Sequence, residues 1–155
     1  MNPERKIDPE KIHVVNITTI KGSIEASEDS DQNSIAGHHF KFELGTGYDI
    51  EEKIVGVQIV VNIDAVDDKE DLLPVKGSYT HEVVMKVENL DDFVEVSKKG
   101  DHEESIKIDG LLGATLVGIA FSTIRGVIYI RTQGTSLGTV ILPVVDPKNM
   151  IESLH

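Results

Sequence analysis

The chain has 155 residues, no cysteine and a formal net charge of −12 at pH 7. This length supports one domain, and the lack of cysteine excludes disulfides, thiol nucleophiles and cysteine-based zinc sites. The negative charge disfavours nucleic acid as a partner, because phosphate contacts need clustered Lys and Arg. Because the first residues contain no apolar stretch typical of a secretory signal, we expect a cytoplasmic protein.

The N-terminal part of the chain divides into a polar arm and a strand. Residues 1–10 are polar and contain Pro3 and Pro9, so we predict a flexible arm there, followed by a single domain over residues 11–155. Residues 12–24 are rich in β-branched side chains and predict a strand, bent or bulged near Gly22.

Three further strands follow from alternating apolar and polar residues, which is typical of a sheet with one buried face. The predicted strands cover residues 40–44, 55–65 and 79–87, and we expect the last to bulge at 89–92 and continue to Val96. Polar stretches between them predict loops or turns at residues 27–34, 45–52, 67–71 and 97–105.

Residues 110–130 form the most apolar stretch and predict a helix of about five turns. The charge-free part, Leu111 to Ile124, is too short to span a membrane, which needs roughly 20 apolar residues. We therefore expect at most a peripheral contact with a membrane. One helical face predicts an oligomer interface, because its small residues let another helix approach: Ala114, Gly118, Ser122 and Gly126. The opposite face can cover a sheet with Leu116, Ile119, Phe121, Ile124 and Ile128.

The C-terminal residues predict a turn at 134–138, an extended segment at 140–145 and a short helix. Asp146 is suited to cap this helix and Pro147 to occupy its first position. Four strands followed by helices predict an α+β fold, with one antiparallel sheet and the helices packed on one face.

The motifs that carry catalysis or metal binding are incomplete or missing. Asp29-x-Asp31-x-Asn33 resembles the start of a calcium loop, but Ser34 replaces the required glycine and Phe40 replaces the final glutamate. His38 and His39 are adjacent, so on a strand they point to opposite faces and do not share a metal. The sequence has no phosphate loop and no nucleophile motif. We therefore predict no metal, no cofactor and no enzymatic activity.

The order of elements over residues 11–152 resembles the SecB protein-export chaperones. Four short motifs carry the resemblance: Ser23-Ile24-Glu25-Ala26, Val87 to Phe93, Leu112-Gly113-Ala114 and Leu142-Pro143-Val144. The resemblance implies a four-stranded antiparallel sheet with one long helix and a short C-terminal helix packed on it. It also implies a homotetramer or a dimer, with the long helices between subunits.

The resemblance implies an ATP-independent chaperone (a holdase) that binds unfolded or newly made polypeptides and could serve protein export. Such clients would lie in apolar grooves between the sheet and the last helix. The matching residues here are Val83, Met85, Phe93, Leu142, Val144 and Met150. The alternative for all six is plain hydrophobic core.

Two lysines depart from the family. Lys21 and Lys86 stand where the family carries carboxylates that dock the translocase motor ATPase, and this reversal of charge opposes the contact. The alternative function is therefore a SecB-fold binding or regulatory protein dedicated to one partner, such as an antitoxin, and not to the translocase.

Overall fold

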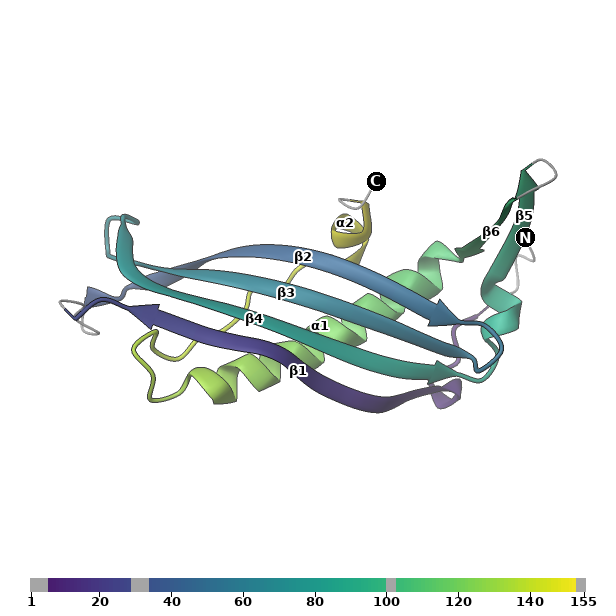
Figure 1. Ribbon diagram of the computed structural model, residues 1–155, viewed down its shortest axis with the longest axis horizontal. Coiled ribbons are helices and arrows are strands. Elements are labelled where there is room, and N and C mark those ends of the chain that lie inside the picture. The colour runs from purple at the N-terminus through teal and green to yellow at the C-terminus, as the bar shows by residue number, and fades with distance from the viewer. Residues whose placement is uncertain (1–5, 29–33, 100–102, 153–155) are drawn as a thin grey trace.

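Four long strands form one antiparallel sheet in the order β1-β4-β3-β2 (Figure 1). The computed structural model describes residues 6–28, 34–99 and 103–152. The strands are β1 (Ile12–Ala26), β2 (Gly37–Asp49), β3 (Ile54–Val66) and β4 (Leu72–Val87). Helix α1 (Gly110–Thr132) crosses one face of the sheet, which we call the inner face. The predicted α+β fold, with one antiparallel sheet and the helices on one face, is confirmed.

Alternation in the two central strands determines which side chains enter the core. In β3 every second residue from Val55 to Ala65 is buried, and the residues between them are partly exposed. Strand β4 repeats this pattern from Val75 to Val87. Because successive side chains point to opposite faces, these buried residues form the inner face. The sequence predicted this arrangement for both strands.

Strand β1 bulges at two places, and one of them is close to Gly22, where the sequence predicted a bend or bulge. Its pairing with β4 shifts register around Val15 and again around Ile20, whereas Gly22 keeps its place opposite Tyr79. A Cβ on Gly22 would lie 3.2 Å from Cε1 of Tyr79. The glycine itself makes room for an aromatic ring, and the bend or bulge predicted near Gly22 is confirmed two residues away, at Ile20.

Strand β2 is longer than the sequence predicted. The expected turn at residues 45–52 is wrong in its first half, because β2 continues to Asp49 and Gly47 pairs with Gly56 of β3. The chain reverses after Ile50, with Lys53 at φ 60°. Gly45 and Gly47, which favoured a turn in the sequence, therefore belong to a strand that is paired with β3.

The chain leaves the main sheet after β4. A short 3-10 helix, η3 (Leu90–Phe93), leads into a separate two-stranded sheet of β5 (Val94–Lys99) and β6 (Glu103–Ile108). This hairpin projects from one end of the molecule (Figure 1). The predicted loop at residues 97–105 is therefore largely strand, and β4 does not extend to Val96.

Helix α1 begins at a capping residue that the alternation patterns did not reveal. The carboxylate Oδ1 of Asp109 accepts hydrogen bonds from the amides of Leu111 and Leu112 at 2.9 and 3.4 Å. Four of the five residues predicted to cover the sheet are buried, and Ile119 is partly exposed. By length and composition alone, this helix is also apolar enough to cross a membrane. One side of it is buried against the inner face, including Leu116, Ile124 and Ile128.

The C-terminal segment returns along α1. Thr132 is buried, and its hydroxyl accepts a hydrogen bond from the amide of Val140 at 2.9 Å. The Arg125 guanidinium then donates to the carbonyl of Pro143 at 3.1 Å. Helix α2 (Pro147–Glu152) follows, with Asp146 accepting from the Lys148 amide at 2.9 Å, as the sequence predicted.

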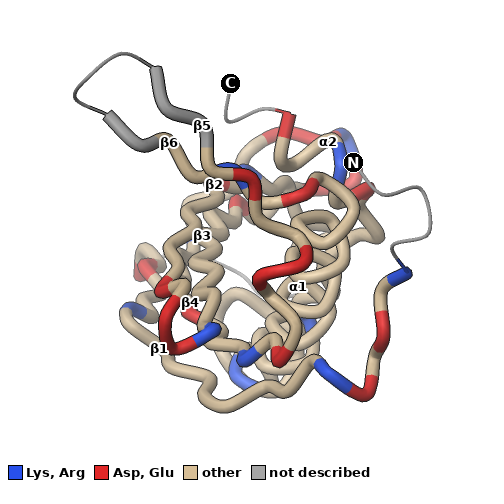
Figure 2. Tube along the Cα trace, turned by 90° about the vertical axis from the view of Figure 1, so that its right-hand side faces the viewer, with Lys and Arg blue, Asp and Glu red and all other residues tan. Residues whose placement is uncertain are grey.

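The start of the domain packs earlier than the predicted flexible arm implies. Within that arm, Ile7 contacts the core and η1 (Pro9–Lys11) forms a 3-10 helix. Viewed end-on, the sheet and α1 form two layers, and acidic residues are spread over several elements (Figure 2).

Candidate functional site

An apolar groove of about 600 Å³ lies where the N-terminal end of α1 crosses the sheet. The inner faces of β2 and β3 contribute Thr46, Tyr48, Val55 and Val57. Residues 106–110 and the first turns of α1 line it from the other layer, and Ile151 of α2 closes one side. Parts of the chain that are distant in sequence, at residues 46–57, 106–117 and 151, therefore build one hollow.

The groove is suited to apolar side chains. Val55, Val57, Leu116 and Val117 are almost fully buried at its base, while Tyr48 at its edge remains 45% exposed. Charged side chains come from Lys107 and Asp109, and the carboxylate of Asp109 is committed to capping α1. A hydrocarbon group entering this space would gain burial without leaving a polar group unsatisfied.

Two connections hold the walls of the groove in place. The hydroxyl of Tyr48 donates to the carbonyl of Ile106 at 3.3 Å, which joins β2 to the hairpin. On the other side, a Cβ on Gly113 would lie 3.7 Å from Cδ1 of Ile151, so α2 rests close to the backbone of α1. The family resemblance implied a groove between the sheet and the last helix, but none of the residues that line this one was among the six predicted, because the lining comes together only in the tertiary fold.

Four of the six predicted client-binding residues belong to the core. Val83, Met85, Phe93 and Leu142 are 0%, 0%, 3% and 2% exposed, so they offer no surface to a client and their predicted role needs correction. Their positions on the inner face, in η3 and in the segment after α1 explain this burial. Val144 is 90% exposed, and Met150 of α2 is partly buried against the core.

The stripe of small residues on α1 is divided between two environments. Ala114 is buried, and Gly118 lies against Pro147 of α2 within the same chain. Ser122 and Gly126 are exposed, and no described atom lies within 4 Å of a Cβ placed on Gly126. The first half of the stripe thus packs within the chain, and its second half is open.

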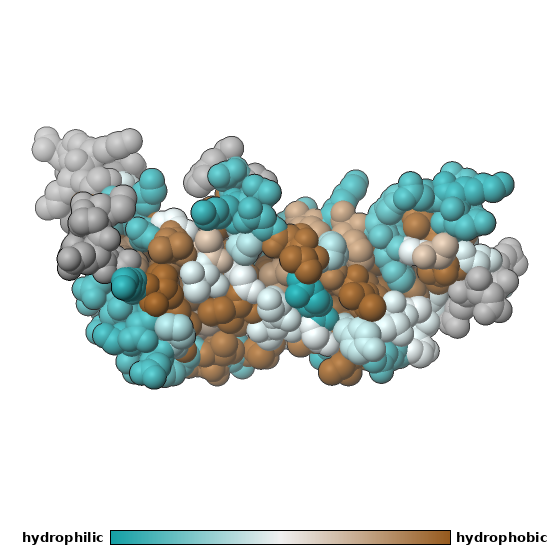
Figure 3. All heavy atoms as spheres, turned by 180° about the vertical axis from the view of Figure 1, so that it is seen from behind, coloured by the Kyte–Doolittle hydropathy of each residue, from teal (hydrophilic) through white to brown (hydrophobic). Residues whose placement is uncertain are grey.

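Exposed apolar side chains continue on this face beyond the groove. Hydrophobic residues spread across the middle of the surface behind the sheet (Figure 3). On α1 and the segment after it, the exposed large apolar side chains are Leu111, Tyr129, Ile130, Ile141 and Val144. This face differs from the outer face of the sheet, where Lys21 and Lys86 are exposed.

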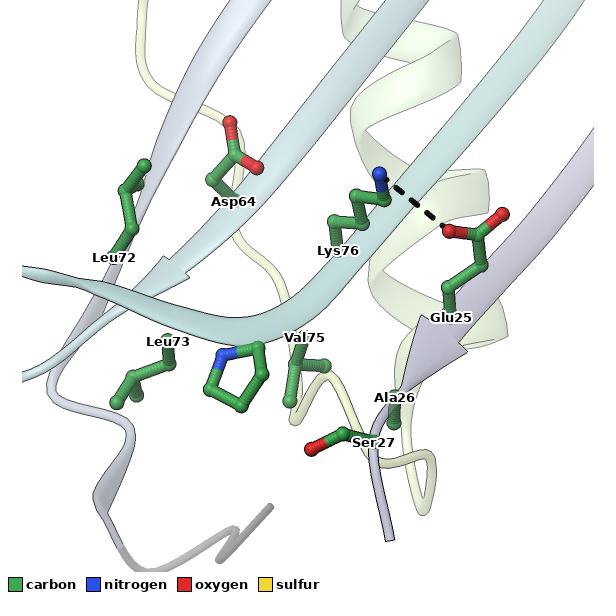
Figure 4. Close-up of a pocket in the computed structure, with 9 residues that line it drawn as sticks. Glu25, Ala26, Ser27, Asp64, Leu72, Leu73, Val75 and Lys76 are labelled. Atoms are coloured by element: carbon green, nitrogen blue, oxygen red, sulfur yellow. Dashed lines mark ion pairs between the residues drawn. The ribbon is translucent and has the colours of Figure 1, made fainter. Parts of the chain in front are cut away.

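A second hollow, of about 410 Å³, lies at the far end of the sheet and has a mixed lining (Figure 4). Lys76 of β4 pairs with Glu25 of β1 at 3.5 Å, with Asp64 of β3 nearby. Both partners of this ion pair are mostly exposed, so the pair contributes little to stability. This second hollow is less suited to an apolar ligand than the groove beneath α1.

The histidines follow the predicted alternation. His38 is partly buried, and its Nε2 lies 2.8 Å from the carbonyl oxygen of Leu137, whereas the next residue, His39, is exposed. Within the described ranges, no group of three His, Asp or Glu side chains is placed to hold a metal. The acidic motif at residues 29–33 lies outside the described residues.

The fold belongs to the class seen in SecB-like chaperones. A similar solved structure is that of the SecB-like chaperone Rv1957 from Mycobacterium tuberculosis, in complex with a ChAD peptide from the antitoxin HigA1. The TM-score between the two structures is 0.59. The match covers 88% of this chain and 91% of that chain, at 10% sequence identity. No protein-family model matches the sequence, and no curated protein sequence does either. The predicted SecB-like fold is thus confirmed at the level of structure.

Proposed function

We propose that this chain is a polypeptide-binding protein that holds non-native segments in the groove beneath α1 without ATP. The apolar groove carries this proposal, because its base is hydrocarbon and its edge is open at Tyr48. The SecB-like fold supports it, since Rv1957 was solved with a bound peptide. Its binding residues would be those at the accessible edge, including Ile106 and Ile151, instead of the four core residues predicted earlier.

A dedicated partner is the second candidate. The peptide bound by Rv1957 comes from an antitoxin, which makes one specific partner a reasonable expectation on this fold. Lys21 and Lys86 lie exposed on the outer face of the sheet, where their positive charge would oppose a surface that docks on carboxylates. We therefore do not propose delivery to the translocase as the main duty.

Three further expectations belong to the same proposal. The protein acts in the cytoplasm, has no catalytic activity and forms a homotetramer or a dimer. The open half of the small-residue stripe, with Ile130 beyond it, supports an α1-mediated contact between subunits.

Binding of a chemically unfolded, slow-folding client tests the proposal directly. Light scattering after size exclusion, without ATP, should show a complex with the mass of the protein plus one or more clients. Ile106→Asp should weaken this complex at least about tenfold, because a charged group in the groove must lose its hydration. Leu72→Asp is the matched control, since Leu72 is 69% exposed at the other end of the sheet.

The outcomes separate the two candidates. If the client aggregates while the protein elutes alone, general chaperone activity is wrong and one specific partner should be sought. If Leu72→Asp weakens binding as much as Ile106→Asp, the client binds elsewhere and the groove is not the site.

A further inference from the structure

His81 is a buried polar residue on the inner face of the sheet. Its exposure is 0%, and neither ring nitrogen has a hydrogen-bond partner among the described residues. Thr132 is buried as well, but its hydroxyl is hydrogen bonded to three backbone groups, the carbonyls of Ile128 and Tyr129 and the amide of Val140. A hydrocarbon side chain would suit the His81 position better, because a buried polar group without a partner costs stability.

The neighbours of His81 come from both layers of the fold. Across the inner face, His81 is paired with Thr19 of β1 on one side and with Ile59 of β3 on the other. Its ring stacks on that of Tyr79, with the ring centroids 6.1 Å apart. Tyr79 is the titratable neighbour on β4. From α1, Arg131 is the charged group that acts on both rings among the described residues.

This environment opposes a positive charge on His81. Burial lowers the pKa of His81, and the nearby Arg131 cation lowers it further. The imidazole is therefore neutral in the folded protein at neutral pH, whereas in the unfolded chain a histidine titrates near pH 6.5. Because the unfolded chain takes up the proton first, stability is fully present above pH 6.5 and falls as pH decreases below that value.

We propose that His81 is an acid-sensitive switch, whose protonation loosens the C-terminal half of α1 from the sheet. The separation of sheet and helix would start at the edge strand β1, because Thr19, which is paired with His81, is next to the register shift at Ile20. Water entering there would solvate the imidazolium and separate it from Arg131. The proposal does not depend on polypeptide binding.

Amide hydrogen exchange of the full chain at about pH 7.5 and about pH 5.5, corrected for intrinsic rates, tests the switch. In the wild type, peptides from residues 121–132 and 79–85 should lose protection as pH falls, by up to about tenfold per pH unit below 6.5. His81→Leu should abolish this loss and keep protection at both pH values. His39→Gln is the matched control, because His39 is exposed on the outer face.

Three results would overturn the proposal. The first is a His81→Leu variant with the same pH dependence as the wild type. The second is equal loss of protection at the distant β2–β3 pair, which would show global acid unfolding. The third is an NMR titration of the wild type in which the His81 ring takes up its proton at pH 6.5 or above. This measurement needs no variant, so it tests the proposal even if His81→Leu fails to fold.

Discussion

Pro147 at the start of α2 rests directly on the backbone of α1 at Gly118, where an added Cβ would lie 3.4 Å from Cγ of the proline. A β-branched side chain at Gly118 would project further into this contact. We predict that Gly118→Val detaches α2 and raises proteolysis and amide exchange across residues 147–152. Global unfolding should change by less than about 1 kcal/mol, because valine has the better helix propensity.

Gly126→Val is the control for that contact, since no described atom lies within 4 Å of a Cβ at Gly126. It should leave the exchange of α2 unchanged. Equal protection of residues 147–152 in the Gly118→Val variant would show that α2 is not held by this contact.

The buried hydroxyl of Thr132 connects the end of α1 to the returning segment. Its Oγ1 accepts from the Val140 amide at 2.9 Å and donates to the Ile128 carbonyl at 2.8 Å. Thr132→Val keeps the shape of the side chain but leaves the buried Val140 amide without its acceptor. The free energy of unfolding, measured in urea, should therefore fall by about 1–3 kcal/mol.

Thr123→Val provides the comparison, because the hydroxyl of Thr123 bonds within α1 to the Ile119 carbonyl at 2.8 Å. That change should lower the free energy of unfolding by less than about 0.5 kcal/mol, since it leaves no amide without an acceptor. Similar costs for the two variants would contradict a special role for the Thr132 contact.

The cap of α1 by Asp109 should be measurable in stability. Its Oδ1 satisfies the amides of Leu111 and Leu112, which would otherwise lack an acceptor in the helix. Asp109→Ala should lower the free energy of unfolding by about 1 kcal/mol, whereas Asp109→Asn should retain most of it. Thermal unfolding of both variants separates capping from a mere change of charge.

Periodicity predicted the parts of the fold that depend on one strand or one helix. The alternation in β3 and β4 placed their core residues correctly, and the face of α1 with Ile124 and Ile128 was predicted to cover the sheet. These patterns are local, because burial follows directly from the direction of each side chain.

Features that depend on contacts between distant segments were not predictable in this way. The bulge predicted near Gly22 lies at Ile20, whereas the role of Gly22 itself is set by the Tyr79 ring on another strand. The polar residues 97–105 gave no strand signal, although β5 and β6 pair through their backbones. The residues that line the groove were missed for the same reason, since Tyr48 and Ile151 come to line one hollow only through tertiary packing.

The open end of α1 predicts how copies of the chain associate. Ile130 lies one turn beyond Gly126 on the same helical face and is 69% exposed. If this face joins subunits, burying Ile130 contributes about 1.5–3 kcal/mol per side chain to assembly. Ile130→Glu should therefore lower the oligomeric mass measured by light scattering at micromolar concentration, without loss of secondary structure.

Leu72→Glu is the matched control, because Leu72 has the same exposed fraction as Ile130, 69%, and lies on β4 instead of α1. It should keep the mass of the wild type. A wild-type protein that is monomeric across the concentration range would refute association through α1, and an unchanged mass in Ile130→Glu would place the subunit contact on another surface.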